Sequence, residues 1–170
     1  MITAIIETRD DEVDLAHALA ALVPAATEGI VRQVIVIDHG SVDGTRVVAD
    51  AAGCTLIEAS RGDTEARRRA IELTRTDWLL LMSPSLRLVA GWQNEAMVFI
   101  DTALVTGKAR VGVAAIRAGT VARGLRGWLK APLSRSQGWL MPKSAYLVSR
   151  PSRRPSSAVS RASGVRRGAA

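Results

Sequence analysis

Residues 34–59, VIVIDHGSVDGTRVVADAAGCTLIEA, decide the fold of this chain. A first apolar run ends at Asp38, and a turn rich in Gly, Ser and Asp leads to a second apolar pattern that begins at Thr45. Small and capping residues of this kind start helices, and Gly53 lies where a helix would end. A further apolar run, residues 54–59, comes directly after it. The stretch therefore predicts a strand, a helix and a strand joined by short turns.

The same alternation extends over the first half of the chain. Buried strands are predicted at residues 3–7, 33–38, 54–59 and 77–82, and the helices between them at 10–29, 45–53 and 61–75. Strands that alternate with helices over short links form a parallel sheet with right-handed crossovers. The predicted fold class is therefore α/β, with a mostly parallel sheet flanked by helices.

The second half has a weaker pattern. A helix is predicted at residues 93–107, a strand at 110–118, and a short strand with a final helix within 137–148. Within residues 120–132, the apolar residues Val121, Leu125, Trp128 and Leu129 share one helical face, which predicts another helix. Residues 149–170 are rich in Ser, Arg, Pro, Gly and Ala and have little to bury, which predicts a disordered basic tail.

Charge is distributed unevenly along the chain. Residues 1–101 hold all sixteen Asp and Glu against nine Arg, for a net charge of −7, whereas residues 102–170 hold fourteen Lys and Arg and no acid. A purely basic segment indicates a surface that faces something anionic. The same asymmetry excludes any mechanism that takes a carboxylate from the second half.

Composition and missing motifs exclude several classes of function. The single cysteine, Cys54, excludes an internal disulfide and a cysteine zinc site, and it fits a reducing compartment. The sequence has neither G-x-G-x-x-G after its first strand nor G-x-x-x-x-G-K-[ST], which excludes the dinucleotide-binding and P-loop classes. No apolar stretch approaches the ~18 residues that span a bilayer, and the N-terminus lacks the basic flank of a signal peptide. We therefore expect a cytoplasmic protein.

Two predicted strand ends carry the polar residues of a candidate site. Asp38 ends a buried strand, where a carboxylate can accept hydrogen bonds from a ribose or a base edge. His39 beside it is interpreted as a turn residue rather than a metal ligand. The run 79–82, LLLM, ends at Ser83-Pro84-Ser85, which places two hydroxyls and no charge at another strand end. Open α/β folds build their active sites at such ends.

Four segments in order resemble glycosyltransferase family 2, whose members have the GT-A fold. They are TAIIETRDDEVDLAHALAAL (3–22), VIVIDHGSVDGT (34–45), RGDTEARRRAIELTRTDWLLLM (61–82) and LRLVAGW (86–92). The resemblance implies a GT-A-like nucleotide-binding sandwich over residues 1–148, with a nucleotide-binding half (1–92) and an acceptor-side half (93–148). The activity it implies is transfer of a sugar from a nucleotide-diphosphate donor to an acceptor hydroxyl, usually with Mg²⁺ or Mn²⁺.

Matched to the family, Thr8, Asp38 and Arg67 fall at positions that contact the donor nucleotide. Glu7 stands where the family usually has a proline after its first strand. For Arg67 an alternative is open, because EARRR also fits a solvated helix face with partners four residues away.

The family's catalytic positions have lost their carboxylates. Ser83 and Ser85 stand at the two acids of the Asp-x-Asp motif, and Ser136 stands at the general base. A neutral hydroxyl is a far poorer ligand for Mg²⁺ than a carboxylate, and it cannot take a proton near neutral pH. We therefore predict no metal site and impaired or metal-independent catalysis, in which a cation such as Arg87 could neutralise the diphosphate. The alternative is a non-catalytic nucleotide-binding or scaffold protein.

The basic segments indicate possible partners besides the nucleotide-diphosphate sugar. Residues 119–131 combine Arg and Lys with Trp and Leu, which is typical of a helix on an anionic membrane surface or of a core-facing helix. The tail could contact anionic lipid or nucleic acid through its charge. It lacks the aromatic residues that stack on bases, so we expect no sequence-specific nucleic-acid binding. Peripheral attachment at the inner face of the membrane is the alternative to a fully cytoplasmic location.

Overall fold

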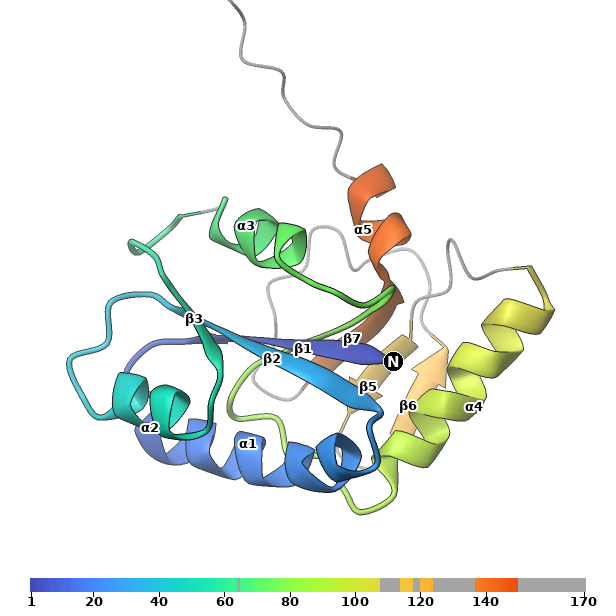
Figure 1. Cartoon of the computed structure of the whole chain (residues 1–170), viewed down its shortest axis with the longest axis horizontal. Coiled ribbons are helices and arrows are strands. Elements are labelled where there is room, and N and C mark those ends of the chain that lie inside the picture. Colours follow the sequence, from blue (N-terminus) through green and yellow to red (C-terminus); the bar gives the residue numbers. More distant parts are fainter. Residues whose placement is uncertain (64, 108–113, 118–119, 124–136, 150–170) are drawn as a thin grey trace, which may run out of the picture.

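The computed structural model describes residues 1–63, 65–107, 114–117, 120–123 and 137–149, which form a sheet between two layers of helices (Figure 1). The elements of the first half are β1 (Ile2–Thr8), α1 (Glu12–Thr27), β2 (Val31–Asp38), α2 (Thr45–Ala51), β3 (Thr55–Glu58), α3 (Ala66–Glu72) and β4 (Trp78–Met82). The second half adds α4 (Trp92–Val105), β5 (Ala114–Arg117), β6 (Thr120–Arg123), β7 (Gln137–Pro142) and α5 (Lys143–Ser149). The predicted alternation of strand and helix in the first half is confirmed.

The sheet has the order β3-β2-β1-β4-β7-β5-β6. The four strands of the first half pair in parallel, as predicted. β7 adds to the edge of β4 antiparallel, and β5 and β6 follow it by two further antiparallel pairs. The α/β class is confirmed. The antiparallel strands of the second half extend the sheet from the edge of β4 that the parallel strands leave unpaired.

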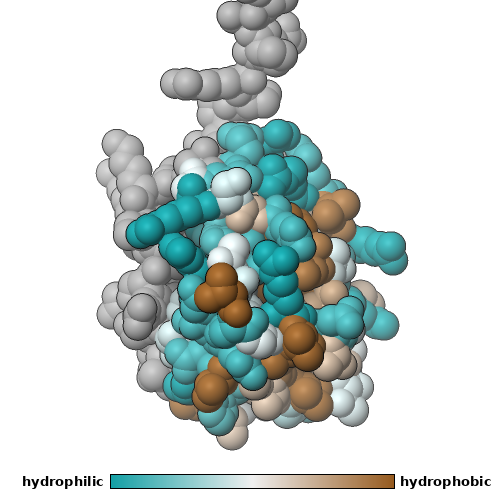
Figure 2. Space-filling view, turned by 90° about the vertical axis from the view of Figure 1, so that its left-hand side faces the viewer, coloured by the Kyte–Doolittle hydropathy of each residue, from teal (hydrophilic) through white to brown (hydrophobic). Residues whose placement is uncertain are grey.

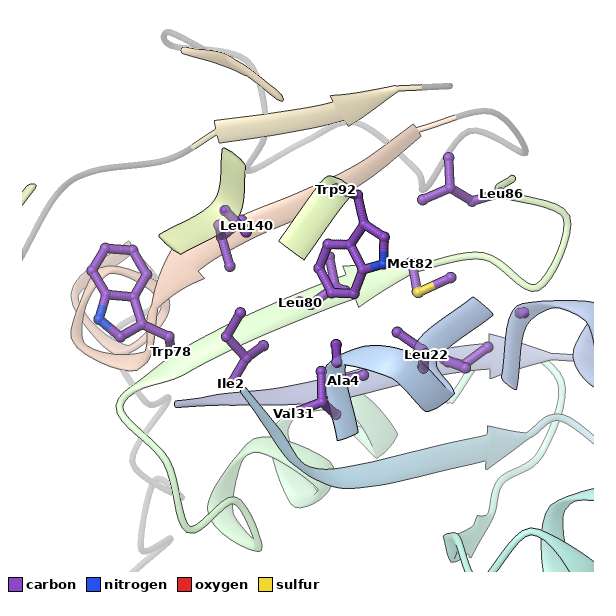
Figure 3. Packing of buried hydrophobic residues seen from close by; sticks show 14 of the residues in the cluster. Ile2, Ala4, Leu22, Val31, Trp78, Leu80, Met82, Leu86, Trp92 and Leu140 are labelled. Atoms are coloured by element: carbon purple, nitrogen blue, oxygen red, sulfur yellow. The ribbon is translucent and has the colours of Figure 1, made fainter. Parts of the chain in front are cut away.

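Helices cover both faces of the sheet. α1, α2 and α4 lie on one face, and α3 and α5 lie on the other (Figure 1). One hydrophobic core fills the space between the sheet and α1 and α4 (Figure 3), and a second core packs α3 and Tyr146 of α5 against the opposite face. Burial on both faces explains why the strands read as continuous apolar runs.

β4 shows this double burial residue by residue. Trp78, Leu80 and Met82 point into the core beneath α1 and α4, where Figure 3 shows them beside side chains of β1 and β7. Leu79 and Leu81 alternate with them and pack into the core on the α3 side. All five residues of the strand are buried. The strand therefore ends where the apolar run ends, directly before Ser83.

The prediction of a helix over residues 120–132 is wrong at its start. Thr120–Arg123 is strand β6, whose backbone pairs antiparallel with β5 from Arg117↔Thr120 to Ala114↔Arg123. Thr120 and Val121 are β-branched and favour extended backbone, and sheet pairing outweighs the helical spacing of the apolar residues. Residues 124–136 lie outside the described part of the chain, and with them lie Ser136 and most of the segment 119–131.

The remaining predictions for the second half are confirmed where the structure describes them. Helix α4 corresponds to the predicted helix 93–107, β5 lies within the predicted strand 110–118, and β7 followed by α5 corresponds to 137–148. α5 ends at Ser149, and the predicted tail beyond it lies outside the described residues. Among the described helices, none has the length and apolar character needed to cross a membrane.

Candidate functional site

The chain changes direction across the sheet at β1. From β1 it moves outward to β2 and β3 through α1 and α2, and it returns through α3 on the opposite face to form β4 on the other side of β1. The parallel registers bring Ile6 beside Met82 and Thr8 beside Asp38, so the carboxyl ends of the three strands share one edge. Ligands of open α/β sheets bind at this kind of switch point, in the crevice outside the carboxyl ends.

A pocket of about 360 Å³ lies at this edge. It is lined by Glu7, Thr8, Arg9, Asp11, His39, Ser83, Pro84 and Ser85. These residues come from the end of β1, the turn after β2 and the loop after β4. Figure 2 shows the corresponding side of the molecule, where hydrophilic residues (teal) cover much of the surface between scattered hydrophobic ones (brown). The pocket thus brings together Thr8, one of the three predicted nucleotide contacts, and the two serines, Ser83 and Ser85, that were matched to the acids of the Asp-x-Asp motif.

The turns after β1 and β2 are locked together by hydrogen bonds. The amide of Asp10 donates to Ser41 Oγ at 2.9 Å, and the Asp10 carboxylate accepts from the amide of Val42 at 2.8 Å. The amide of Glu12 donates to Asp43, and the Glu12 carboxylate accepts in return from the amide of Gly44. Asp10 has a positive φ of 51°, a conformation that Asp tolerates better than most residues. The acids after β1 therefore serve the turn as well as the helix N-terminus.

Asp38 is fully buried and holds the turn that follows it. One carboxylate oxygen accepts from the amide and the hydroxyl of Ser41, and the other accepts from Nε of Arg46 at 2.6 Å. Burial by itself would raise the pKa of Asp38, but the hydrogen bonds from Ser41 and Arg46 lower it below its ordinary value. The sequence did not reveal this use of Asp38, and a nucleotide contact by its carboxylate stays a prediction.

Arg67 projects from α3 toward the end of β1 and forms an ion pair with Glu7. Its Nε donates to Glu7 Oε1, and both side chains are about three-quarters buried, with 23% and 24% of their surfaces exposed. Burial acts to lower the pKa of Arg67, but the hydrogen bond and charge of Glu7 raise it overall. Arg67 is therefore not part of a solvated helix face, unlike its neighbour Arg68, which pairs with Glu65 and Glu72.

His39 lies on the other side of Glu7. Its Nε2 is 3.8 Å from Glu7 Oε2, and its Nδ1 is 3.2 Å from the carbonyl oxygen of Ser60. His39 occupies the turn after β2, as predicted, and it also lines the pocket. Sequence reasoning did not find this pairing. The only signal was that Glu7 and His39 each lie next to the Thr8↔Asp38 pair of neighbouring strands.

The loop after β4 is attached to the first turn of α1. Ser85 Oγ donates to the Asp14 carboxylate at 2.8 Å, and Arg87 donates to the same carboxylate at 2.5 Å and to the carbonyl of Pro84 at 3.2 Å. The hydrogen bonds from Arg87 and Ser85 lower the pKa of Asp14. Asp14 thus lies beside Ser85, which was matched to a metal-ligand position of the family, but its charge is already balanced by the Arg87 guanidinium.

These donors do not fit Mg²⁺ or Mn²⁺. Ser83 and Ser85 offer neutral hydroxyls, and the Asp14 carboxylate accepts from both Ser85 and Arg87. Of the two carboxylates that line the pocket, Glu7 pairs with Arg67 and Asp11 accepts from the amide of Arg9. Such ions are normally held by one or two carboxylates together with substrate phosphates. Within the described residues, no group of three or more His, Cys, Asp or Glu is placed to hold a metal ion.

No protein-family model matches the chain, and a search of curated proteins found no match. Solved structures do resemble it. Glucosyl-3-phosphoglycerate synthase from Mycobacterium tuberculosis, in complex with phosphoglyceric acid, superposes with a TM-score of 0.55 at 18% identity, over 84% of this chain and 57% of that one. The same enzyme in complex with Mn²⁺, UDP and glucosyl-3-phosphoglycerate gives a TM-score of 0.51 at 20% identity, over 66% of this chain and 42% of that one.

A structure described as a mycobacterial protein gives a TM-score of 0.51 at 23% identity, over 66% of this chain and 39% of that one. At these identities the likeness shows the fold alone, which is a GT-A-like α/β sandwich. The chain spans between 39% and 57% of the length of these three structures.

Proposed function

We propose that the pocket between the ends of β1 and β4 binds a nucleotide-diphosphate sugar, and that the chain is a family 2 glycosyltransferase-like protein. The observation that carries this proposal is the position of the pocket at the switch point of a GT-A-like sheet. A structurally similar enzyme was solved with UDP and Mn²⁺, which supports the class of ligand. The activity proposed is transfer of the sugar to an acceptor hydroxyl.

Thr8 is the predicted nucleotide residue with direct access to this pocket. Asp38 is fully buried in the turn, so a contact with ribose or base would require displacement of Ser41 or Arg46. Arg67 would have to exchange Glu7 for a group of the nucleotide. We therefore propose that Thr8 contacts the nucleotide directly. Asp38 holds the turn beside the pocket and contacts the nucleotide only if Ser41 or Arg46 is displaced, and Arg67 contacts it only if Glu7 is displaced.

Catalysis is proposed to be impaired or metal-independent. The leaving diphosphate needs positive charge, and the hydroxyls of Ser83 and Ser85 cannot recruit it through a metal ion. The alternative source is a guanidinium, and Arg87 lies on the loop that forms one wall of the pocket. The predicted base position, Ser136, lies outside the described residues and cannot accept a proton near neutral pH.

One observation favours the second candidate, a non-catalytic binding or scaffold protein. Arginines around the pocket are already engaged by acids of the chain, with Arg67 on Glu7 and Arg87 on Asp14. A diphosphate must therefore compete with carboxylates for these cations. Two further proposals stay predictions. One is that segment 119–131 and the basic tail contact an anionic membrane surface, and the other is that the protein is cytoplasmic.

Calorimetric titration with UDP-glucose and GDP-mannose, each with and without Mn²⁺, tests this function. A metal-independent transferase binds a sugar nucleotide equally well under both conditions and releases nucleoside diphosphate slowly. A binding protein shows the same affinity with no release. The proposed ligand class is wrong if neither compound binds. As a matched comparison, a double variant with Ser83→Asp and Ser85→Asp is expected to gain Mn²⁺-dependent binding.

A further inference from the structure

Glu7 separates the pocket from a buried cation. Its carboxylate lines the pocket, and behind it Arg67 donates to Oε1 from α3. Arg67 itself is not among the lining residues. The second carboxylate oxygen faces His39, whose Nε2 lies 3.8 Å away. The guanidinium is thus one side chain removed from any ligand in the pocket.

The charge that the pocket presents is mainly negative. Glu7 and Asp11 line it together with Arg9, whose Nε lies 3.7 Å from Asp10. An incoming diphosphate meets the Glu7 carboxylate before it can reach Arg67. The diphosphate and the Glu7 carboxylate carry charge of the same sign and repel each other, and the repulsion is stronger where side chains are partly buried. A ligand that carries a diphosphate therefore either binds without Arg67 or displaces Glu7 from it.

We propose that Glu7 sets the affinity of this pocket for diphosphates by holding Arg67 away from it. The inference rests on the proposed function for the class of ligand, a diphosphate. The role of Glu7 in pairing with Arg67 does not depend on that function. Arg68 pairs with Glu65 and Glu72 and Arg69 with Asp63, and none of these acids lines the pocket, so their ion pairs hold no cation away from it. Among the residues that the structure describes, only the Glu7–Arg67 pair joins a residue of the pocket lining to a three-quarters-buried guanidinium.

Replacement of Glu7 by Gln tests this role. The amide keeps a hydrogen-bond acceptor for Arg67 but removes the charge, so Arg67 becomes available to an anion. We expect inorganic pyrophosphate to bind Glu7→Gln roughly tenfold more tightly than the unaltered protein by calorimetry, since one interaction between unit charges about 4 Å apart at a protein surface is worth about that factor. The gain should shrink as KCl is added. If Glu7→Gln does not fold, Glu7→Met makes the same test.

Two further variants separate Arg67 from a general change of charge. Glu72 pairs with Arg68 on the exposed face of α3. Glu72→Gln removes this carboxylate and should leave pyrophosphate affinity unchanged. Glu7→Gln should raise pyrophosphate affinity much less in a protein that already carries Arg67→Gln, where only the direct repulsion by Glu7 is removed. A gain of the same size with and without Arg67, or an equal gain in Glu72→Gln, would show that Glu7 does not act through Arg67 and would overturn the proposal.

UDP-glucose distinguishes this inference from the proposed function. Tighter pyrophosphate binding by Glu7→Gln without any UDP-glucose binding supports the role of Glu7 and rejects the sugar-nucleotide ligand. UDP-glucose binding by the unaltered protein, with no gain for either ligand in Glu7→Gln, supports the function and rejects the role of Glu7. If neither ligand binds either protein, both are rejected.

Discussion

The carboxyl edge of the sheet is built differently on the two sides of β1. On the β2 side, Asp38, Ser41 and the acids after β1 bond to one another and to backbone amides, so their polar groups are used to hold two turns together. On the β4 side, the strand is followed by Ser-Pro-Ser, and the loop is held by Asp14 and by the buried side chain of Leu86. A polar residue at the end of a parallel strand therefore does not by itself indicate a ligand contact. The hydrogen-bond partners of such a residue show whether it is available to a ligand or holds the local structure.

The largest effect is expected at Asp38. Asp38→Ala leaves the amide and hydroxyl of Ser41 and the Nε of Arg46 without their acceptor, which should lower the free energy of unfolding by about 2–4 kcal/mol. Urea denaturation measures this change. The control Asp50→Ala, on the exposed surface of α2, should change stability by no more than about 0.5 kcal/mol. Equal effects for both variants would contradict a structural role for Asp38.

The β4 side should be sensitive to packing instead. A Cβ added at Gly138 of β7 would lie 2.9 Å from Leu86 Cδ2 and 3.2 Å from the carbonyl oxygen of Leu81. Gly138→Ala should therefore displace Leu86 and cost about 1–3 kcal/mol in thermal or urea unfolding.

Gly44→Ala is the matched variant on the β2 side. The three atoms nearest to its Cβ would all belong to the Glu12 carboxylate, the end of a flexible side chain that can move away, so it should cost less than Gly138→Ala. A reversed order would mean that the turns, rather than the loop after β4, are limited by close packing.

Acid should have its clearest effect on the β2 side, because Asp38 is fully buried whereas the Asp14 side chain on the β4 side is one-third exposed. The pKa of Asp38 is lower in the folded protein than in the unfolded chain, so the unfolded chain binds more protons as the pH falls. The stability that Asp38 contributes is complete above about pH 4, the ordinary value for Asp, and it is lost as the pH falls through the folded value. Unfolding free energies of Asp38→Asn and the unaltered protein should therefore converge below about pH 4. A constant difference down to pH 2 would contradict this account.

The smallest effect is expected at Ser85. Ser85→Ala removes one hydrogen bond to Asp14, which keeps its pair with Arg87 at the surface, so stability should fall by no more than about 1 kcal/mol. Differential scanning calorimetry measures it. A loss as large as that for Asp38→Ala would show that both sides of β1 are held by hydrogen bonds to the same degree.

Much of the fold could be predicted from local sequence. Apolar runs bounded by Gly, Asp and Ser mark β1, β2 and β4, because strands buried on both faces leave no polar position inside the run. The short strand β6 escaped prediction because four residues carry too little periodicity, and their pairing with β5 is decided by the sheet.

The candidate site was less predictable because its contacts join distant parts of the chain. Glu7 and Arg67 are sixty residues apart, and Asp14 and Ser85 are seventy-one apart. The resemblance to a family indicated Thr8, Asp38 and Arg67 as candidate residues, but not which side chains of the chain already bond to them. That information depends on strand order and register, which place the ends of β1, β2 and β4 at one edge.

The central claim is that this edge of the sheet has a pocket for a sugar nucleotide but no carboxylates at positions 83 and 85 to coordinate a divalent cation. A crystal of the protein grown with UDP-glucose and MnCl₂, with data collected at the manganese absorption edge, tests it most directly. We predict density for the nucleotide beside Thr8 and no anomalous peak near Ser83 and Ser85. A manganese ion coordinated by oxygen ligands at Ser85 would contradict the account.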